Sequence, residues 1–219
     1  MPAALSHKRK LAFFSIPKSG STSMKLCLYK LEHGAPFEGK PDDVHPHFKT
    51  YPVKACDFEG LDDYFKFTIV RDPVKRLLSS WGNRIFEHED LLKYLPKRLD
   101  KRLRFFLKNR FYKTKPSAEY FFRNLESYQK ANYSIWHHTV SVKTFVGEDL
   151  SFFDKVYRLE AIGELEKDLS ERTGLDIVLP REQVGGPKVL YDELPSDVQS
   201  FVGDYTRQDY LFLKDFYSA

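Results

Sequence analysis

The stretch KLAFFSIPKSGSTS, residues 10–23, decides the fold because it reads as a strand, a tight turn and the start of a helix. Residues 10–16 are mostly apolar and aromatic, which is typical of a short strand buried on both faces. Pro17 ends this strand, and the apolar spacing from Ser21 onward predicts a helix that ends before Gly34. Such a turn directs backbone N–H groups of the helix start toward one point, where the helix dipole also favours an anion.

The side chains of this turn suit a phosphate. Lys18 adds a positive charge, and Thr22 and Ser23 add hydroxyl donors. The turn is not a Walker A loop, because GxxxxGK followed by Ser or Thr places the lysine after the second glycine, whereas Lys18 precedes Gly20. The alternative interpretation is an ordinary connection between a strand and a helix.

A second stretch, YFKFTIVRDPVKRLLSSW at residues 64–81, repeats the order of strand, turn and helix. Asp72 as N-cap and Pro73 at the first helical position predict the helix start. Arg71 leaves the strand end, where a guanidinium can bind a phosphate through two N–H groups, and Ser79 lies two turns into the helix. The alternative is an arginine that caps the sheet and a serine on an exposed helix face.

Strands and helices alternate along the rest of the chain, which predicts an α/β fold around a mainly parallel sheet with flanking helices. We expect one domain over residues 1–219. In such sheets ligands bind at the carboxyl ends of the strands, where both junctions lie. The other expected elements are strands at 48–56, 140–145 and 156–159 and helices starting at 96 and over 117–131, 162–172 and 194–205.

Composition excludes several classes of protein. The chain has 219 residues, of which 42% are hydrophobic and 16% aromatic, too many for a disordered chain. The longest apolar run near the N-terminus, residues 11–14, is too short for a signal peptide or a membrane span. Two cysteines, Cys27 and Cys56, form no disulfide framework and suit a reducing compartment. We therefore expect a soluble, cytoplasmic protein.

The positive charge is concentrated in one segment. Residues 93–115 contain ten Lys or Arg and one acidic residue, a net charge of +9. Because the whole chain carries +4, the remaining residues sum to −5. Such a block is either a solvated helix face or a site that attracts a polyanion or an acidic substrate.

Together the two junctions resemble the phosphate-binding motifs of sulfotransferases that use 3′-phosphoadenosine 5′-phosphosulfate (PAPS). Residues 17–23, PKSGSTS, resemble the 5′-phosphosulfate loop, and residues 71–81 resemble the 3′-phosphate motif. The resemblance is above all to the Golgi-type carbohydrate sulfotransferases, including the heparan sulfate 2-O-sulfotransferase group. FDKVYRLE at 153–160 and YTRQDY at 205–210 resemble further segments of that family. The resemblance implies a three-layer α/β sandwich like that of P-loop nucleoside triphosphate hydrolases.

The resemblance also implies the cofactor and the residues that hold it. PAPS would be the donor and adenosine 3′,5′-bisphosphate (PAP) the product, with no metal required, because a lysine and backbone amides can stabilise charge on the leaving phosphate. Lys188, in a late loop, is a further candidate contact to the nucleotide. Lys18 would bind the bridging oxygen and the 5′-phosphate, Arg71 and Ser79 the 3′-phosphate, and the remaining loop contacts would come from Pro17, Ser19, Gly20, Ser21, Thr22 and Ser23.

The acceptor hydroxyl needs a base, which the resemblance places between the two junctions. That interval holds His45-Pro46-His47, with His47 as the first candidate and His45 as helper or alternative. A histidine pair on a surface loop is the other interpretation, and two histidines alone lack the further ligands of a metal site. The next candidates for the base are His137 and His138, then Glu38 and Asp57.

The acceptor itself is expected to be a hydroxyl-bearing glycan, including anionic ones, rather than a nucleic acid or a membrane. Candidate acceptor contacts are His137, Lys101 and Arg102, although Thr139 and Val140 stand where the family has Pro-Gln after its His/Trp segment. A tyrosine or a small molecule remains open as the acceptor. Family members of the secretory pathway are membrane-tethered, so the chain is expected to be bacterial or otherwise cytosolic, or truncated.

Two other functions compete with a sulfotransferase. One is a P-loop kinase-like nucleotide enzyme, against which the position of Lys18 argues. The other is a non-catalytic module that binds polyanions through residues 93–115, which would leave both phosphate-like junctions unexplained.

Overall fold

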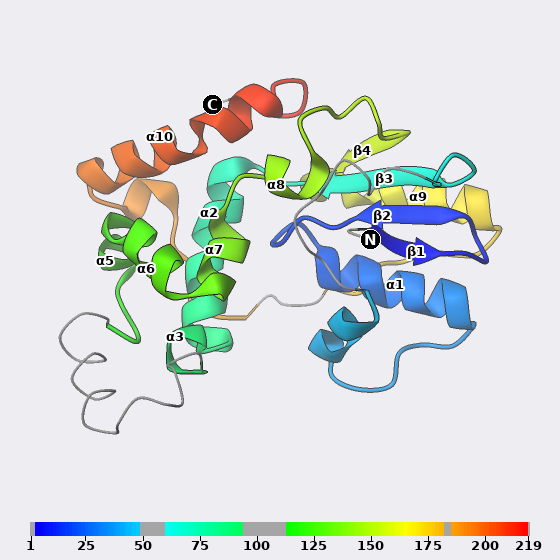
Figure 1. Ribbon diagram of the computed structural model, residues 1–219, viewed down its shortest axis with the longest axis horizontal. Coiled ribbons are helices and arrows are strands. Elements are labelled where there is room, and N and C mark those ends of the chain that lie inside the picture. Colours follow the sequence, from blue (N-terminus) through cyan, green and yellow to red (C-terminus); the bar gives the residue numbers. More distant parts are fainter. Residues whose placement is uncertain (1–2, 49–59, 94–112, 182–184, 219) are drawn as a thin grey trace. The chain divides into compact units, whose positions relative to one another are not determined.

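The computed structural model describes residues 3–48, 60–93, 113–181 and 185–218 (Figure 1). Its residues group into two compact units. The first unit comprises Met1–Arg71 and Val142–Val184, and the second comprises Asp72–Ser141 and Gly185–Ala219. The expectation of a single domain over the whole chain stays a prediction.

The first unit contains a four-stranded sheet in the order β1-β2-β3-β4 (Figure 1). β1 runs antiparallel to β2, and β2, β3 and β4 run parallel to one another. A mostly parallel sheet flanked by helices confirms the predicted α/β class. The strands are Ala3–Ser6 (β1), Leu11–Phe14 (β2), Phe65–Val70 (β3) and Lys155–Arg158 (β4).

Alternating side chains of the strands build the core of this unit. Phe13 stacks on Phe67, with 5.4 Å between ring centroids, and Tyr157 meets Phe67 edge-on. These rings belong to one hydrophobic cluster with residues of α1 (Ser21–His33) and α9 (Ile162–Thr173). On the other face Phe14 packs against two further phenylalanines that precede β4. Burial on both faces explains why β2 is uniformly apolar.

Two expectations about strands were wrong or incomplete. Residues 140–145 are not a strand, because a short helix, α8 (Lys143–Val146), occupies the end of this segment. β1 was not predicted, since its formation depends on pairing with β2 rather than on a local pattern. The strand expected at 48–56 lies outside the described residues except for Phe48, which ends the 3₁₀ helix η1 (Pro41–His47). A second 3₁₀ turn, η4 (Leu159–Ala161), joins β4 to α9.

The second unit is helical in its described residues. The helix expected over 117–131 is interrupted at Asn124, whose side-chain amide donates to the Tyr120 carbonyl at 2.8 Å and whose backbone leaves the helical region. The helix expected from residue 96 lies outside the described residues. The elements are α2 (Pro73–Trp81), the π-helical η3 (Gly82–Glu87), α3 (Asp90–Lys93), α5 (Ala118–Arg123), α6 (Leu125–Ala131), α7 (Tyr133–Thr139), η5 (Tyr191–Glu193) and α10 (Ser196–Phe212).

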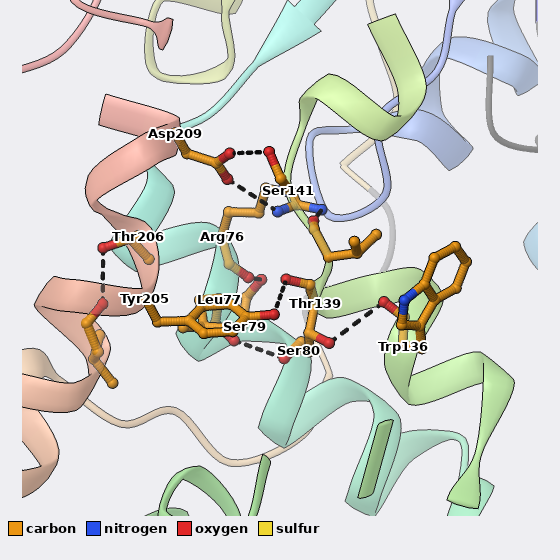
Figure 2. A network of polar contacts seen from close by, with 12 residues as sticks. Arg76, Leu77, Ser79, Ser80, Trp136, Thr139, Ser141, Tyr205, Thr206 and Asp209 are labelled. Carbon is orange, nitrogen blue, oxygen red and sulfur yellow. Dashed lines mark hydrogen bonds and ion pairs between the residues drawn. The ribbon is translucent and has the colours of Figure 1, made fainter. Parts of the chain in front are cut away.

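A buried arginine links three segments of the second unit (Figure 2). Arg76 of α2 is 1% exposed, and its Nη2 donates to the Val140 carbonyl at 2.8 Å. Its Nη1 lies 3.7 Å from the Asp209 carboxylate of α10, which also accepts a hydrogen bond from Ser141 at 2.5 Å. Nearby, the Tyr205 hydroxyl donates to the Thr139 carbonyl at 3.3 Å. The buried charge is thus paired and hydrogen-bonded, which is the condition for tolerating it in a core.

Candidate functional site

The turn between β2 and α1 has an unusual backbone. Lys18 and Gly20 both have positive φ, 67° and 76°, and the Ser19 N–H donates to the Ile16 carbonyl at 3.3 Å. A Cβ on Gly20 would lie 3.0 Å from Leu159 Cδ1, so the turn has little room for a larger residue. Positive φ at a lysine is uncommon and often accompanies a functional turn. The residue that precedes α1, Gly20, provides no side-chain cap for the helix N–H groups.

Buried hydroxyl groups surround this turn. The side chains of Ser15 and Ser19 are 2% and 0% exposed, and neither hydroxyl has a hydrogen-bond partner among the described residues. Native proteins normally satisfy buried polar atoms, so orphaned hydroxyls point to a missing ligand or water. Together with the Lys18 ammonium and the uncapped start of α1, they form a donor set that fits a phosphate or a phosphosulfate.

Arg71 lies beside the same turn. It follows β3, which is the parallel neighbour of β2, and its Nη1 donates to the Lys18 carbonyl at 3.1 Å. Parallel neighbouring strands end at the same edge of a sheet, which explains why the two motifs meet although 53 residues separate them. The structure therefore brings together the Lys18 turn and the Arg71 side chain, as the sequence predicted for the two strand ends.

The two candidate histidines have different surroundings. His45 Nε2 lies 2.9 Å from Thr22 Oγ1, and His45 Nδ1 lies 3.2 Å from Lys25 Nζ. His47 is exposed, and its ring lies edge-on to Tyr29 at 5.4 Å between centroids. Both histidines are residues of the 3₁₀ helix η1. The His45 side chain contacts the start of α1, whereas the His47 side chain is exposed.

Lys25 is a member of this group that the sequence analysis missed. It is 1% exposed, and burial lowers the pKa of its ammonium group to about 7. The signal was present in the sequence, because Lys25 follows Thr22 by three residues and residues at that spacing share a helix face. A lysine on the buried face of an amphipathic helix breaks the apolar pattern and marks a position of chemical interest.

Ser79 and Lys188 belong to the second unit, so their grouping with Arg71 stays a prediction. Ser79 is half-buried in α2, and its hydroxyl donates to the Arg76 carbonyl at 2.7 Å. Lys188 is exposed and follows a segment that packs tightly on the end of α2. A Cβ on Gly82 would lie 2.0 Å from the Pro187 carbonyl oxygen. Gly82 therefore allows the late loop to approach the helix that carries Ser79.

The remaining candidates are distributed over both units and the residues that are not described. His137 and His138 are half-buried on α7, where His138 Nδ1 lies 2.7 Å from the Ser134 carbonyl and the two rings meet edge-on. Glu38 is exposed in the first unit. Lys101, Arg102 and Asp57 lie outside the described residues, as does most of the basic segment.

Within the part of the chain that the structure describes, no three His, Cys, Asp or Glu residues are placed to hold a metal ion together. In the same part of the chain, no helix combines the length and apolar character needed to span a membrane.

The fold and the turn define an α/β protein in which a turn with donors suited to an anion lies at neighbouring strand ends. The model of the sulfotransferase family matches residues 2–201, and the chain therefore belongs to the sulfotransferase family. Carbohydrate sulfotransferase 10 of Xenopus laevis is 35% identical over 88 residues, which are 36% of this chain and 25% of that protein. The human protein of the same name is 35% identical over 85 residues, 35% of this chain and 24% of that protein.

These relatives are similar to the chain only in part. The chain matches about a quarter of the length of the curated relatives. No solved structure matches it with significance. The match to the family model thus establishes the sulfotransferase family for this chain.

Proposed function

We propose that this protein transfers a sulfuryl group from PAPS to a hydroxyl group of a carbohydrate. The observation that carries the proposal is the turn at residues 17–23, with its buried, unpartnered Ser19 hydroxyl and with Arg71 bonded to the Lys18 carbonyl. Family membership implies PAPS as the donor in general. The family match extends through both units, which supports the idea that residues 1–219 act as one sulfotransferase domain.

The first unit supplies groups for the phosphosulfate end of the donor. The N–H groups of residues 20–22 and the hydroxyls of Ser19, Thr22 and Ser23 would surround the 5′-phosphate at the start of α1. Arg71 would turn its remaining N–H groups toward the 3′-phosphate while its Nη1 holds the turn. Ser79 and Lys188 are proposed as further contacts to the nucleotide.

Lys18 is proposed to act mainly in the transition state. PAPS supplies an activated sulfuryl group whose transfer leaves negative charge on the phosphate oxygen. A preorganised ammonium group and backbone amides stabilise such developing charge, because they need no reorganisation when it appears. Lys18 would supply the ammonium group, and the start of α1 would supply the backbone amides.

His47 is proposed as the base that takes the proton of the acceptor hydroxyl. Its exposed imidazole is accessible to an acceptor, whereas both ring nitrogens of His45 already contact Thr22 and Lys25. Tyr29 and Phe37 pack against the His47 ring and can orient it. His45 is the alternative base, and to act as one it must first break its contacts with Thr22 and Lys25.

Calorimetric titration with PAP and with adenosine 5′-monophosphate tests the donor site. We expect PAP to bind more tightly by about 2–4 kcal/mol, since charge-assisted hydrogen bonds to the second phosphate are worth about 1.5–3 kcal/mol each. Arg71→Ala should erase this preference, and Lys167→Ala, which removes an exposed charge from α9, should retain it. Equal affinity of the wild-type protein for both nucleotides would refute the proposed donor.

Two parallel arms separate the competing functions and identify the acceptor. ATP with Mg²⁺ binding more tightly than PAP would favour a kinase-like enzyme, and heparin binding without nucleotide binding would favour a polyanion-binding module.

A screen with labelled PAPS over glycans, peptides and small alcohols tests the acceptor. We expect label in the glycans, and label found in peptides alone would replace the carbohydrate by tyrosine.

A further inference from the structure

Three polar groups form a chain that leads from the interior of the first unit to the start of α1. Lys25 Nζ lies 3.2 Å from His45 Nδ1, and His45 Nε2 lies 2.9 Å from Thr22 Oγ1. Lys25 and Thr22 are 1% and 3% exposed, so water does not separate these groups from one another. Thr22 is the second residue of α1, at the end of the helix that favours an anion.

The charge of a lysine ammonium group determines which atom donates in each of these two hydrogen bonds. An ammonium group only donates hydrogen bonds, so His45 Nδ1 must accept the bond from Lys25. A neutral imidazole then carries its proton on Nε2, which donates to Thr22 Oγ1. The hydroxyl proton of Thr22 is therefore directed away from His45, and it is available to an anion at the start of α1.

The reversed arrangement, in which His45 Nδ1 donates to Lys25, is less favourable. It would require either a neutral Lys25 amine or a cationic imidazole beside Thr22. A cation at the start of a helix is repelled by the helix dipole, which favours the proton on Lys25, deeper along α1. Burial lowers the pKa of Lys25 to about 7, and an anion bound at the helix start would oppose that decrease.

We propose that Lys25 is a positioning residue, which fixes His45 in the Nε2–H tautomer and thereby makes the Thr22 hydroxyl a hydrogen-bond donor to the phosphate of the sulfuryl donor. The identity of that phosphate rests on the proposed function, whereas the tautomer does not. Lys25 touches neither the donor nor the acceptor in this arrangement. Its effect reaches the donor only through His45 and Thr22.

Nitrogen NMR on protein with ¹⁵N-labelled histidine tests the tautomer in the absence of any ligand. We expect the signals of His45, assigned by their loss in His45→Gln, to show Nε2 protonated and Nδ1 unprotonated at pH 6.5, below the pKa of about 7 at which Lys25 loses its proton. In Lys25→Met this pattern should give way to a mixture of tautomers, whereas Lys30→Met, which removes an exposed lysine of the same helix, should keep it. A wild-type protein with Nδ1 protonated would overturn the proposal, whether or not the variant folds.

A double-mutant cycle with PAP tests the coupling to the phosphate. Thr22→Val and Lys25→Met should each weaken PAP binding about tenfold, and together they should weaken it by little more than either alone, because both act through one hydrogen bond. Thr22→Ser should retain most of the affinity. Losses that multiply would overturn the coupling. If the wild-type protein binds no PAP but keeps the Nε2–H tautomer, the proposed function fails and the assignment of the tautomer by Lys25 stands.

Discussion

At the scale of single residues, Lys18 combines a strained backbone with a functional side chain. Its φ of 67° lies in a region that a lysine rarely adopts, and its carbonyl is held by Arg71. Strain of this kind is maintained only where the surrounding structure enforces it. The turn is therefore preorganised before any ligand arrives.

Replacing Lys18 tests its role in the transition state. We expect Lys18→Ala to lower kcat by about 10²–10³, the scale of losing one donor to a developing oxyanion, with a smaller change in donor affinity. Steady-state kinetics with saturating PAPS measure this effect, and thermal unfolding controls for the fold. Wild-type activity that a chelator abolishes and Mg²⁺ restores would contradict this assignment of the charge stabilisation to Lys18.

The two histidines can be separated by the parameter that each one changes. His47→Ala should lower kcat by about 10²–10⁴, the usual contribution of a general base, and leave donor binding near that of the wild type. His45→Ala should weaken donor binding, since His45 contacts Thr22 at the start of α1. Near-normal turnover of His47→Ala with a good acceptor would move the base to His45 or to the histidines of α7.

Lys25 also has a measurable effect on stability. Burial lowers its pKa from 10.5 to about 7, so the unfolded chain binds more protons than the folded protein between these two values. The contribution of Lys25 therefore increases the free energy of unfolding as pH rises from about 7 to about 10.5. Lys25→Met should raise the stability more at pH 6.5 than at pH 9.5, measured by urea unfolding. Lys30→Met, on the exposed face, should show no such difference.

At the scale of elements, the two junctions were predictable because their signals are local. Pro17 and Gly20 mark the first turn, and Asp72 with Pro73 marks the start of α2, where the Asp72 carboxylate accepts from the Lys75 N–H at 2.8 Å. Each of these signals depends on neighbouring residues in the chain. The boundaries of α2 and α9 were close to those expected for the same reason.

The elements that the sequence analysis missed depend on distant partners. β1 exists through its pairing with β2. Residues 140–145 have a β-branched composition, but Lys143–Val146 form α8 and the Val140 carbonyl accepts a hydrogen bond from Arg76. Tertiary contacts outweigh strand propensity at such places. The contact between Lys25 and His45 could not be predicted, because only the fold brings His45 back to α1.

The cap of α2 gives a prediction for an element. Asp72 accepts hydrogen bonds from the Lys75 N–H at 2.8 Å and from the Tyr210 hydroxyl at 2.9 Å. It therefore connects the start of α2 to the last turn of α10. Asp72→Ala should lower the free energy of unfolding by about 1–2 kcal/mol, and Asp72→Asn by less, since asparagine also caps helices. Chemical denaturation measures both. PAP affinity should change less than in Arg71→Ala, although the two residues are adjacent.

At the scale of the whole molecule, each unit has a hydrophobic core of its own, and the two cores are supported differently. The first unit relies on the sheet and its aromatic rings. The second unit contains the buried pair of Arg76 and Asp209 (Figure 2). A buried pair specifies one arrangement of its helices, because breaking it leaves a charge without a partner.

The buried pair predicts an asymmetric pattern of stability. Arg76→Met should destabilise the protein by about 3–5 kcal/mol, since it removes the ion-pair partner of the buried Asp209 carboxylate. The double substitution of Arg76→Met with Asp209→Leu should recover part of this loss. Urea unfolding of the three proteins measures it, and a double variant less stable than Arg76→Met would contradict the assignment.

The buried hydroxyls of Ser15 and Ser19 have a consequence for directed evolution of this protein. An unpartnered buried hydroxyl costs about 1–3 kcal/mol, so alanine at these positions is expected to raise the melting temperature of the ligand-free chain. A selection for heat resistance alone would therefore favour alanine at Ser15 and Ser19. The change at Ser19 would then lower the activity, because Ser19 is a proposed contact to the sulfuryl donor. Selection in the presence of PAP would reverse this preference at Ser19, because the bound phosphate would then supply the partner that the Ser19 hydroxyl lacks.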